Sequence, residues 1–224
     1  MSKNNNKMGL NMSKNKTLAQ FFRVDDVDFN LIETDKVKQE TAHIIIDAQR
    51  YFADPTYQHN PDNPDYPQGG GDEKTNATSE NIATLVPKFK EAGLQTGWVY
   101  FRNMPDQNED TYGGYHNVSP DKDTDFFAGK STTSPFEDKD SHFKETLVNN
   151  GVKNLIVSGF NTSACLYQTV LDALNEDFNV CVLVDMTENG EGGDPKLQEK
   201  LDHMREEGAI LTDSEQVLHL LAEL

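Results

Sequence analysis

The sequence predicts an α/β fold, a three-layer α/β/α sandwich around a mostly parallel, Rossmann-like central sheet. The first observation is a set of short apolar runs at residues 42–46, 155–157 and 180–184, typical of strands buried on both faces of a parallel sheet. These runs alternate with segments of helical apolar spacing, which indicates βαβ units. With right-handed crossovers, the helices cover both faces of the sheet. The 224 residues suffice for one such domain with a sizeable core.

The chain opens with a polar stretch before the first strand. Residues 1–17 are rich in Asn and Lys and lack hydrophobic periodicity, so we expect a disordered tail, with residues 18–224 forming a single domain. Residues 42–47 form the first predicted strand. Asp47 stands at the carboxyl end of this strand, where open α/β sheets place their ligands.

A long loop and a helix are predicted after this strand. Residues 53–79 hold four prolines and a run of three glycines, and we interpret them either as a flap beside the site or as a tolerated surface insertion. The following helix is predicted from about Glu80 to Ala92, capped by Ser79 or Thr78. Pro87 lies inside that helix and predicts a kink or a break there.

The alternation of strands and helices continues to the end of the chain. A second strand is predicted at residues 96–103, followed by an irregular stretch at 104–125 that is rich in Asp, Asn and Gly. Further strands are predicted at residues 154–160, 180–185 and 209–212, and helices at residues 141–150, 165–177, 195–207 and from Ser214 onward.

Cys165 is the first chemically distinctive residue. It follows the turn Ser158-Gly159 and opens the predicted helix at residues 165–177. Backbone N–H groups and the positive end of the helix dipole converge at such a position and are expected to lower the pKa of the thiol. The alternative is that Cys165 is a small buried apolar residue, as most free cysteines are.

Charge and composition exclude some classes of partner. The formal net charge is −18, with acidic residues spread along the chain, which argues against nucleic acid and anionic membranes as partners. Two cysteines do not make a disulfide framework, so we expect both to be reduced and the protein to be cytoplasmic. We find neither a secretory signal nor an apolar run of the roughly 18 residues that a membrane span needs.

Three residues together suggest catalysis. A thiol nucleophile such as Cys165 needs a base to take its proton and a positive charge to stabilise the thiolate. Asp47 and Lys130 supply those two groups, both at predicted strand ends or in adjoining loops. Taken singly, Asp47 would be a cap or surface carboxylate and Lys130 a solvated loop lysine.

Four motifs in order strengthen this hypothesis and identify a family. The first motif is apolar-Asp-x-Gln-x-x-Phe at residues 44–52, and the second is Lys-x-x-x-Ser-x-Phe at residues 130–136. The third is Gly-x-x-Thr-x-x-Cys at residues 159–165, and the fourth, at residues 173–185, is Ala173 followed by a buried strand that ends in a carboxylate. Over residues 40–222 the chain resembles the isochorismatase-like cysteine hydrolases, a superfamily that includes nicotinamidases, N-carbamoylsarcosine amidohydrolases, ureidoacrylate hydrolases and isochorismatases.

This resemblance implies a catalytic triad of Asp47 as general base, Lys130 as the stabilising cation and Cys165 as nucleophile. It also implies a cis peptide bond between Phe160 and Asn161, and an oxyanion hole made by the N–H groups of Asn161 and Cys165. The expected substrate is a small molecule with an amide, ureido or carbamoyl C–N bond. By resemblance we expect a homodimer or homotetramer and no cofactor.

The chain also departs from the resemblance. Nicotinamidases carry a metal site that begins with Asp-x-His, and this motif is missing after the second strand, so we predict no metal ligand set; His59 and His116 are ligand types without the spacing. Substrate contacts are assigned to Phe52, Arg102 and Phe160, with Arg102 suited to a substrate carboxylate. Two alternatives stay open: an isochorismatase-type vinyl ether hydrolase, which does not need the thiol, and a non-catalytic binding protein on the same fold.

Overall fold

The computed structural model describes residues 34–57, 71–102, 114–190 and 192–222. In this part of the chain a six-stranded parallel sheet has the order β3-β2-β1-β4-β5-β6. The strands are β1 Thr41–Ile46, β2 Gln95–Phe101, β3 Phe126–Lys130, β4 Asn154–Phe160, β5 Asn179–Glu188 and β6 Ile210–Thr212. The predicted tail at residues 1–17 lies outside the described residues.

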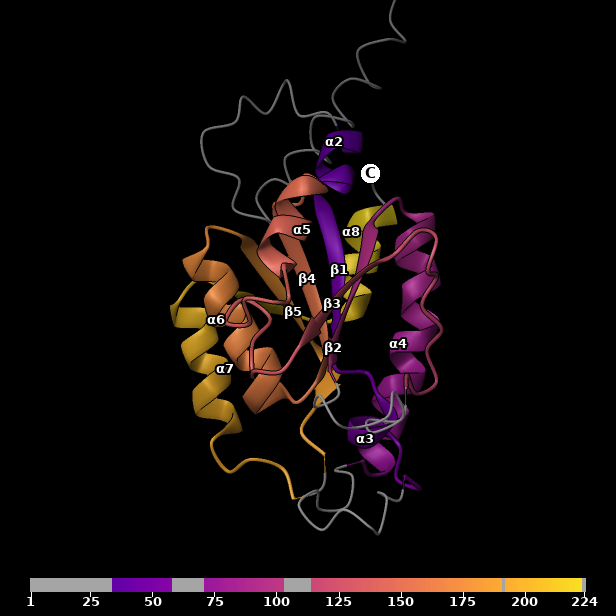
Figure 1. Cartoon of the computed structure of the whole chain (residues 1–224), viewed down its shortest axis with the longest axis vertical. Helices are drawn as coiled ribbons and strands as arrows, with labels where there is room; N and C mark the ends of the chain where they lie inside the picture. Colours follow the sequence, from indigo (N-terminus) through magenta and orange to yellow (C-terminus); the bar gives the residue numbers. More distant parts are fainter. Residues whose placement is uncertain (1–33, 58–70, 103–113, 191, 223–224) are drawn as a thin grey trace, which may run out of the picture.

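Helices cover both faces of the sheet, as Figure 1 shows, with α5, α6 and α7 on one side and α4 and α8 on the other. The helices are α2 Thr34–Gln39, α3 Arg50–Ala53, α4 Glu73–Glu91, α5 Phe143–Asn149, α6 Tyr167–Asn175, α7 Leu197–Glu206 and α8 Ser214–Ala222, with a π-helical turn η1 at Thr162–Leu166. This arrangement confirms the predicted α/β/α sandwich. None of the described helices has both the length and the apolar character that crossing a bilayer requires.

One apolar core lies between the sheet and each of its two helical layers. Side chains alternate along β1: Ile45 packs in the core that contains residues of α4 and α8, whereas Ile44 and Ile46 pack in the core with residues of α5 and α6. All six residues of β1 and all seven of β4 are buried. These two central strands therefore give the carboxyl edge of the sheet a rigid base.

Helix α4 begins earlier than the sequence predicted. The predicted start at Glu80 is wrong, because Asp72 caps the helix by accepting hydrogen bonds from the N–H groups of Lys74 and Thr75 at 2.9 and 2.8 Å. The hydroxyl of Thr75 in turn accepts the N–H of Asp72 at 2.7 Å. This cap follows a proline- and glycine-rich stretch, whose composition hid it. Residues 58–70 of the predicted loop lie outside the described residues.

Strand β3 was not predicted, and β5 runs further than expected. β3 has only five residues and includes a glycine and a lysine, which hides its apolar pattern. β5 continues past Asp185 to Glu188, and its register with β4 shifts between Val157 and Gly159. The Asp185 carboxylate accepts hydrogen bonds from the N–H and hydroxyl of Ser214 at 2.9 and 2.6 Å, so it caps α8.

Candidate active site

A buried ion pair lies at the carboxyl edge of the sheet. Nζ of Lys130 is 2.7 Å from Oδ2 of Asp47, and neither side chain is exposed to solvent. Lys130 ends β3 and Asp47 follows β1, with β2 between them in the sheet. Taking two charges out of water costs several kcal/mol per ion before their mutual attraction offsets it. A buried ion pair often adds little to the stability of a fold. Because buried charged groups are common at functional sites, we take this pair as a candidate functional site.

Phe101 and Thr132 fix the lysine side chain over the end of β2. The ammonium lies 4.3 Å from the ring centroid of Phe101 and donates to the carbonyl of Thr132 at 3.4 Å. A cation over an aromatic face is attracted to the ring, most strongly where water is excluded. Phe101 is itself anchored by Gln49, whose side-chain amide bonds both the N–H and the carbonyl of Phe101 at 2.7 and 3.2 Å.

The backbone turns sharply at both strand ends beside this pair. Asp47 has a φ of 50°, an uncommon conformation for a residue other than glycine. Gly159 has a φ of 111°, and a Cβ there would lie 2.1 Å from the carbonyl oxygen of Ile46. Only glycine permits this close approach of β4 to β1. The turn after β4 is thereby held against the residue that precedes Asp47.

Cys165 lies in the turn after β4. The peptide bond between Phe160 and Asn161 is cis, and the chain then enters the π-helical turn η1. The carbonyl of Asn161 accepts hydrogen bonds from the N–H groups of Ala164 and Leu166 at 3.0 and 3.1 Å. Cys165 thus sits inside the π-helical turn, not in the first turn of α6 as predicted, and its side chain is 8 % exposed.

Two residues at the carboxyl end of β5 brace this turn, and neither was predicted from the sequence. Oδ1 of Asn189 accepts hydrogen bonds from both the N–H and the hydroxyl of Ser163 at 2.8 and 2.7 Å. The hydroxyl of Thr187 donates to the carbonyl of Gly159 at 2.7 Å and bonds the hydroxyl of Thr162 at 2.8 Å. The signal that would have located them is the extension of β5 beyond Asp185, which carries both residues to the edge of the site.

Burial dominates the acid–base properties of the three groups. Desolvation raises the pKa of the Asp47 carboxyl, while the charge and hydrogen bond of Lys130 oppose that shift. Desolvation, followed by the charge of Asp47, raises the pKa of the Cys165 thiol to about 12. The predicted lowering of the Cys165 pKa is therefore wrong, because burial and the charge of Asp47 outweigh the opposing effect of Lys130.

Lys130 binds only one of the two carboxylate oxygens of Asp47, Oδ2. Oδ1 has no partner at hydrogen-bond geometry in the described part of the chain, although the Cys165 thiol interacts with this carboxylate closely enough to shift its pKa. A buried acceptor without a partner is costly, and it is also positioned to receive a proton. The arrangement brings together a thiol, a carboxylate with a free oxygen and a cation.

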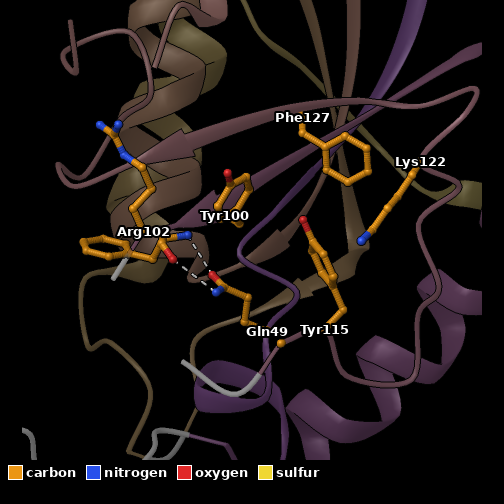
Figure 2. A pocket seen from close by; sticks show the side chains of 8 residues that line it. Gln49, Tyr100, Arg102, Tyr115, Lys122 and Phe127 are labelled. Atoms are coloured by element: carbon orange, nitrogen blue, oxygen red, sulfur yellow. Dashed lines mark hydrogen bonds between the residues drawn. The ribbon is translucent and has the colours of Figure 1, made fainter. Parts of the chain in front are cut away.

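The three predicted substrate-contact residues have different surroundings. Phe160 is fully buried in the apolar core, so it offers no surface to a ligand and its observed role is packing. Arg102 donates from Nη2 to Asp138 at 2.6 Å, and its guanidinium turns away from Gln49 and Tyr115 in Figure 2. Phe52 is partly buried, with its ring 6.5 Å from that of Phe101, and it remains near the site.

The described residues do not fit a metal ion. No group of three or more His, Cys, Asp or Glu side chains comes together in the described ranges. His116 bonds the amide oxygen of Asn76 at 2.7 Å, and burial lowers its pKa. His59, the other predicted ligand type, lies outside the described residues.

Comparison with known proteins defines the class. The fold and the sequence are those of the isochorismatase domain, whose model matches residues 41–216. The chain therefore belongs to the isochorismatase family, which confirms the resemblance inferred from the four motifs.

Two curated relatives come from Dictyostelium discoideum. Isochorismatase family protein 1B is 27% identical over 81 residues, which are 36% of this chain and 37% of the relative. Isochorismatase family protein 1A is 26% identical over 83 residues, 37% of this chain and 38% of the relative. The matched part spans well under two thirds of either relative.

Solved structures share the fold at low identity. The cysteine hydrolase from Pseudomonas syringae pv. phaseolicola has a TM-score of 0.68 at 17% identity, covering 83% of this chain and 93% of that one. The pyrazinamidase of Pyrococcus horikoshii in complex with zinc has a TM-score of 0.62 at 21% identity, covering 78% and 99%. The N-carbamoylsarcosine amidase from Thermoplasma acidophilum has a TM-score of 0.61 at 18% identity, covering 79% and 97%.

Proposed function

We propose that this protein is a cysteine hydrolase that cleaves the C–N bond of a small amide, ureido or carbamoyl substrate through an acyl-enzyme on Cys165. The observation that carries the proposal is the buried Asp47–Lys130 pair, with Nζ and Oδ2 2.7 Å apart and the Cys165 thiol interacting with both charges. A thiol, a base and a cation in one water-poor site are the groups that thiol-based acyl transfer needs. The amidases among the solved structures with this fold support the same chemistry.

The first step couples proton transfer to attack. The pKa of Cys165 is about 12, so the thiol is protonated at neutral pH. Asp47 takes the thiol proton through its free Oδ1 as Sγ bonds to the carbonyl carbon of the substrate. Negative charge then moves from Asp47 to the substrate oxygen, while Lys130 stays within reach of both. The Asp47 proton passes to the leaving nitrogen, which departs as ammonia or an amine.

The second step is hydrolysis of the acyl-enzyme. Asp47, again a carboxylate, takes a proton from a water molecule that attacks the thioester carbon. The carbon–sulfur bond breaks, the acid is released, and Asp47 returns the proton to Sγ. Lys130 keeps its charge throughout, so it stabilises whichever partner is negative.

The backbone of the turn supplies the oxyanion hole in this proposal. The N–H groups of Asn161 and Cys165 would bind the oxygen of the tetrahedral intermediate. The turn that carries them is fixed by the hydrogen bonds of Thr187 and Asn189, which supports their preorganisation. One such donor is typically worth about 100- to 1000-fold in rate.

A substrate screen tests the proposal. The full chain is incubated with amides, ureido compounds, carbamoyl compounds and a vinyl ether substrate, with ammonia, amine or pyruvate release measured. We expect C–N cleavage by the wild type and loss of at least about 1000-fold in Cys165→Ala and Asp47→Asn. Vinyl ether cleavage that survives Cys165→Ala but not Asp47→Asn would establish the ether hydrolase instead. The non-catalytic alternative predicts no turnover of any compound and unchanged ligand binding in both variants.

A further inference from the structure

Lys130 is anchored through its backbone as well as through its ammonium. The N–H of Arg102 donates a hydrogen bond to the carbonyl of Lys130 at 2.7 Å. The N–H and the hydroxyl of Ser131 both donate to Oδ2 of Asp138, at 2.6 and 2.8 Å. The peptide unit that joins Lys130 to Ser131 is therefore held at both its carbonyl and its N–H. Because that unit sets ψ of Lys130, it also limits the rotamers that the lysine side chain can adopt.

Arg102 and Asp138 join these two anchors into one closed unit. Nη2 of Arg102 donates to Oδ2 of Asp138 at 2.6 Å, so residue 102 contacts Lys130 through its backbone and Asp138 through its side chain. The Asp138 side chain is 6 % exposed. Burial would raise the pKa of Asp138, but the hydrogen bonds from Arg102 and Ser131 outweigh it and hold the pKa well below its usual range. Asp138 therefore stays a carboxylate at neutral pH and keeps Arg102 as its counter-ion.

Gly129 leaves the space in which the arginine side chain crosses β3. A Cβ at Gly129 would lie 2.6 Å from Cγ and 2.7 Å from Cδ of Arg102. These distances are far inside van der Waals contact, so any side chain at residue 129 would displace the stem that carries the guanidinium to Asp138. Three consecutive residues thus supply the passage, the cation and the anchored peptide: Gly129, Lys130 and Ser131.

The same carboxylate fixes a second contact of the ammonium. By binding the N–H of Ser131, Asp138 closes the loop at residues 131–138 onto its own first residue. That loop contains Thr132, whose carbonyl accepts from Nζ of Lys130 at 3.4 Å. The Thr132 hydroxyl donates to the carbonyl of Ser134 at 2.7 Å, which stiffens the loop further. The Lys130 side chain therefore depends on Asp138 at both its backbone and its tip.

We infer that Arg102 and Asp138 are positioning residues that act through the backbone of Lys130. They hold its ammonium where it contacts Asp47 at 2.7 Å and acts on Cys165. The strength of a charge-assisted hydrogen bond depends on its distance and angle, so a small shift of the lysine would weaken this contact. The guanidinium is bound to Asp138 and turns away from the other labelled side chains in Figure 2, which supports this role over the substrate contact that the sequence suggested. The catalytic meaning of this role rests on the function proposed above for Lys130.

Alkylation of Cys165 tests the inference without a substrate. Lys130 opposes the rise in the thiol pKa that burial and Asp47 cause, so a displaced ammonium leaves less thiolate. The full chain is treated with iodoacetamide at pH 8, and Cys165 is followed by peptide mapping. We expect labelling to be about fivefold slower in both Asp138→Asn and Arg102→Met than in the wild type. The two variants change the charge in opposite directions, so a slower rate in both reports the lysine that they share.

A background without the lysine separates positioning from general damage. In Asp47→Asn/Lys130→Met, adding Asp138→Asn should change the labelling rate of Cys165 by less than about twofold, because there is no ammonium to displace. Asp202→Asn makes the same charge change in an exposed pair with Arg205 and should label as the wild type does.

These rates distinguish the inference from the proposed reaction, because labelling needs no turnover. Slower labelling in both single variants, in a chain that hydrolyses none of the screened compounds, would support the inference and contradict the reaction. Labelling of Cys165 in Asp138→Asn as fast as in the wild type, or faster, would overturn the inference. Equal slowing by Asp138→Asn with and without Lys130 would overturn it as well.

Discussion

Lys130 and Asp47 form an ion pair with Nζ and Oδ2 2.7 Å apart, and both side chains are wholly excluded from solvent. The two residues are brought together across β2 by the strand order of the sheet. The pair has a consequence for stability, since removing one member leaves the other charge buried without compensation. The structure thus predicts that single and double variants behave differently.

Asp47→Asn is expected to lower the free energy of unfolding by about 3–5 kcal/mol, because Lys130 loses its counter-charge. The double variant Asp47→Asn/Lys130→Met removes both charges and should recover most of that loss. Urea unfolding at neutral pH measures both. Lys153→Gln, which breaks the exposed pair with Glu40, is the control and should change stability little. A double variant less stable than either single variant would contradict this account of the pair.

The reactivity of Cys165 should rise when Asp47 is neutralised. Asp47 is one cause of the raised thiol pKa, whereas Lys130 opposes it, so Asp47→Asn should bring the pKa down from about 12. We expect iodoacetamide labelling of Cys165 at pH 8 to be at least about tenfold faster in Asp47→Asn than in the wild type.

Peptide mapping separates this labelling from that of Cys181, the internal control. Cys181 is fully buried, and its pKa is raised by burial alone, so Asp47→Asn should leave its labelling unchanged. Faster labelling at both cysteines would indicate general loosening of the fold. Slower labelling at Cys165 would show that the assigned charge coupling has the wrong sign.

His43 should make the protein sensitive to acid. Its ring is buried in β1, where Nε2 bonds the Ser158 hydroxyl at 2.8 Å, and burial lowers its pKa from 6.5 to about 3. Below pH 6.5 the unfolded chain takes up a proton that the folded chain refuses, so stability falls as the pH drops from 6.5 toward 3. Urea midpoints at pH 7 and pH 5 should therefore differ less in His43→Gln than in the wild type. His142→Gln, at an exposed position, should retain the wild-type difference.

Gly159 should tolerate no side chain. A Cβ there would meet the carbonyl oxygen of Ile46 at 2.1 Å in a central strand that is buried on both faces. Gly159→Ala is expected to cost more than about 4 kcal/mol of unfolding free energy, in the range of the most damaging substitutions. Gly151 has a φ of 70° with no atom within 4 Å of its Cβ position, so Gly151→Ala should cost only about 1–2 kcal/mol. Equal losses in the two variants would show that the close approach is relieved by movement.

The fold was predictable where apolar runs are long. β1 and β4 are buried along their whole length and β5 from Val180 to Leu183, and the positions of these strands were predicted to within a few residues. The short edge strand β3 was missed because its pattern includes Gly129 and Lys130. The start of α4 was missed because its cap, Asp72, lies in a stretch whose composition predicts a loop.

The sequence predicted which residues form the candidate site but not the pKa of the Cys165 thiol. Motif order identified Asp47, Lys130 and Cys165, which the structure brings together. Local sequence suggested a low thiol pKa, whereas burial and Asp47, both tertiary effects, raise it. The bracing role of Asn189 depends on where β5 ends, which the sequence pattern placed three residues too early.

The central claim is that Cys165 carries the acyl group during turnover. Once a substrate is found, the full chain is mixed with it, quenched within one turnover and analysed by intact-protein and peptide mass spectrometry. We predict a mass increase equal to the acyl group, located on the peptide that contains Cys165, and neither adduct nor turnover in Cys165→Ala. Undiminished turnover by Cys165→Ala, or an acyl group on another residue, would contradict the mechanism.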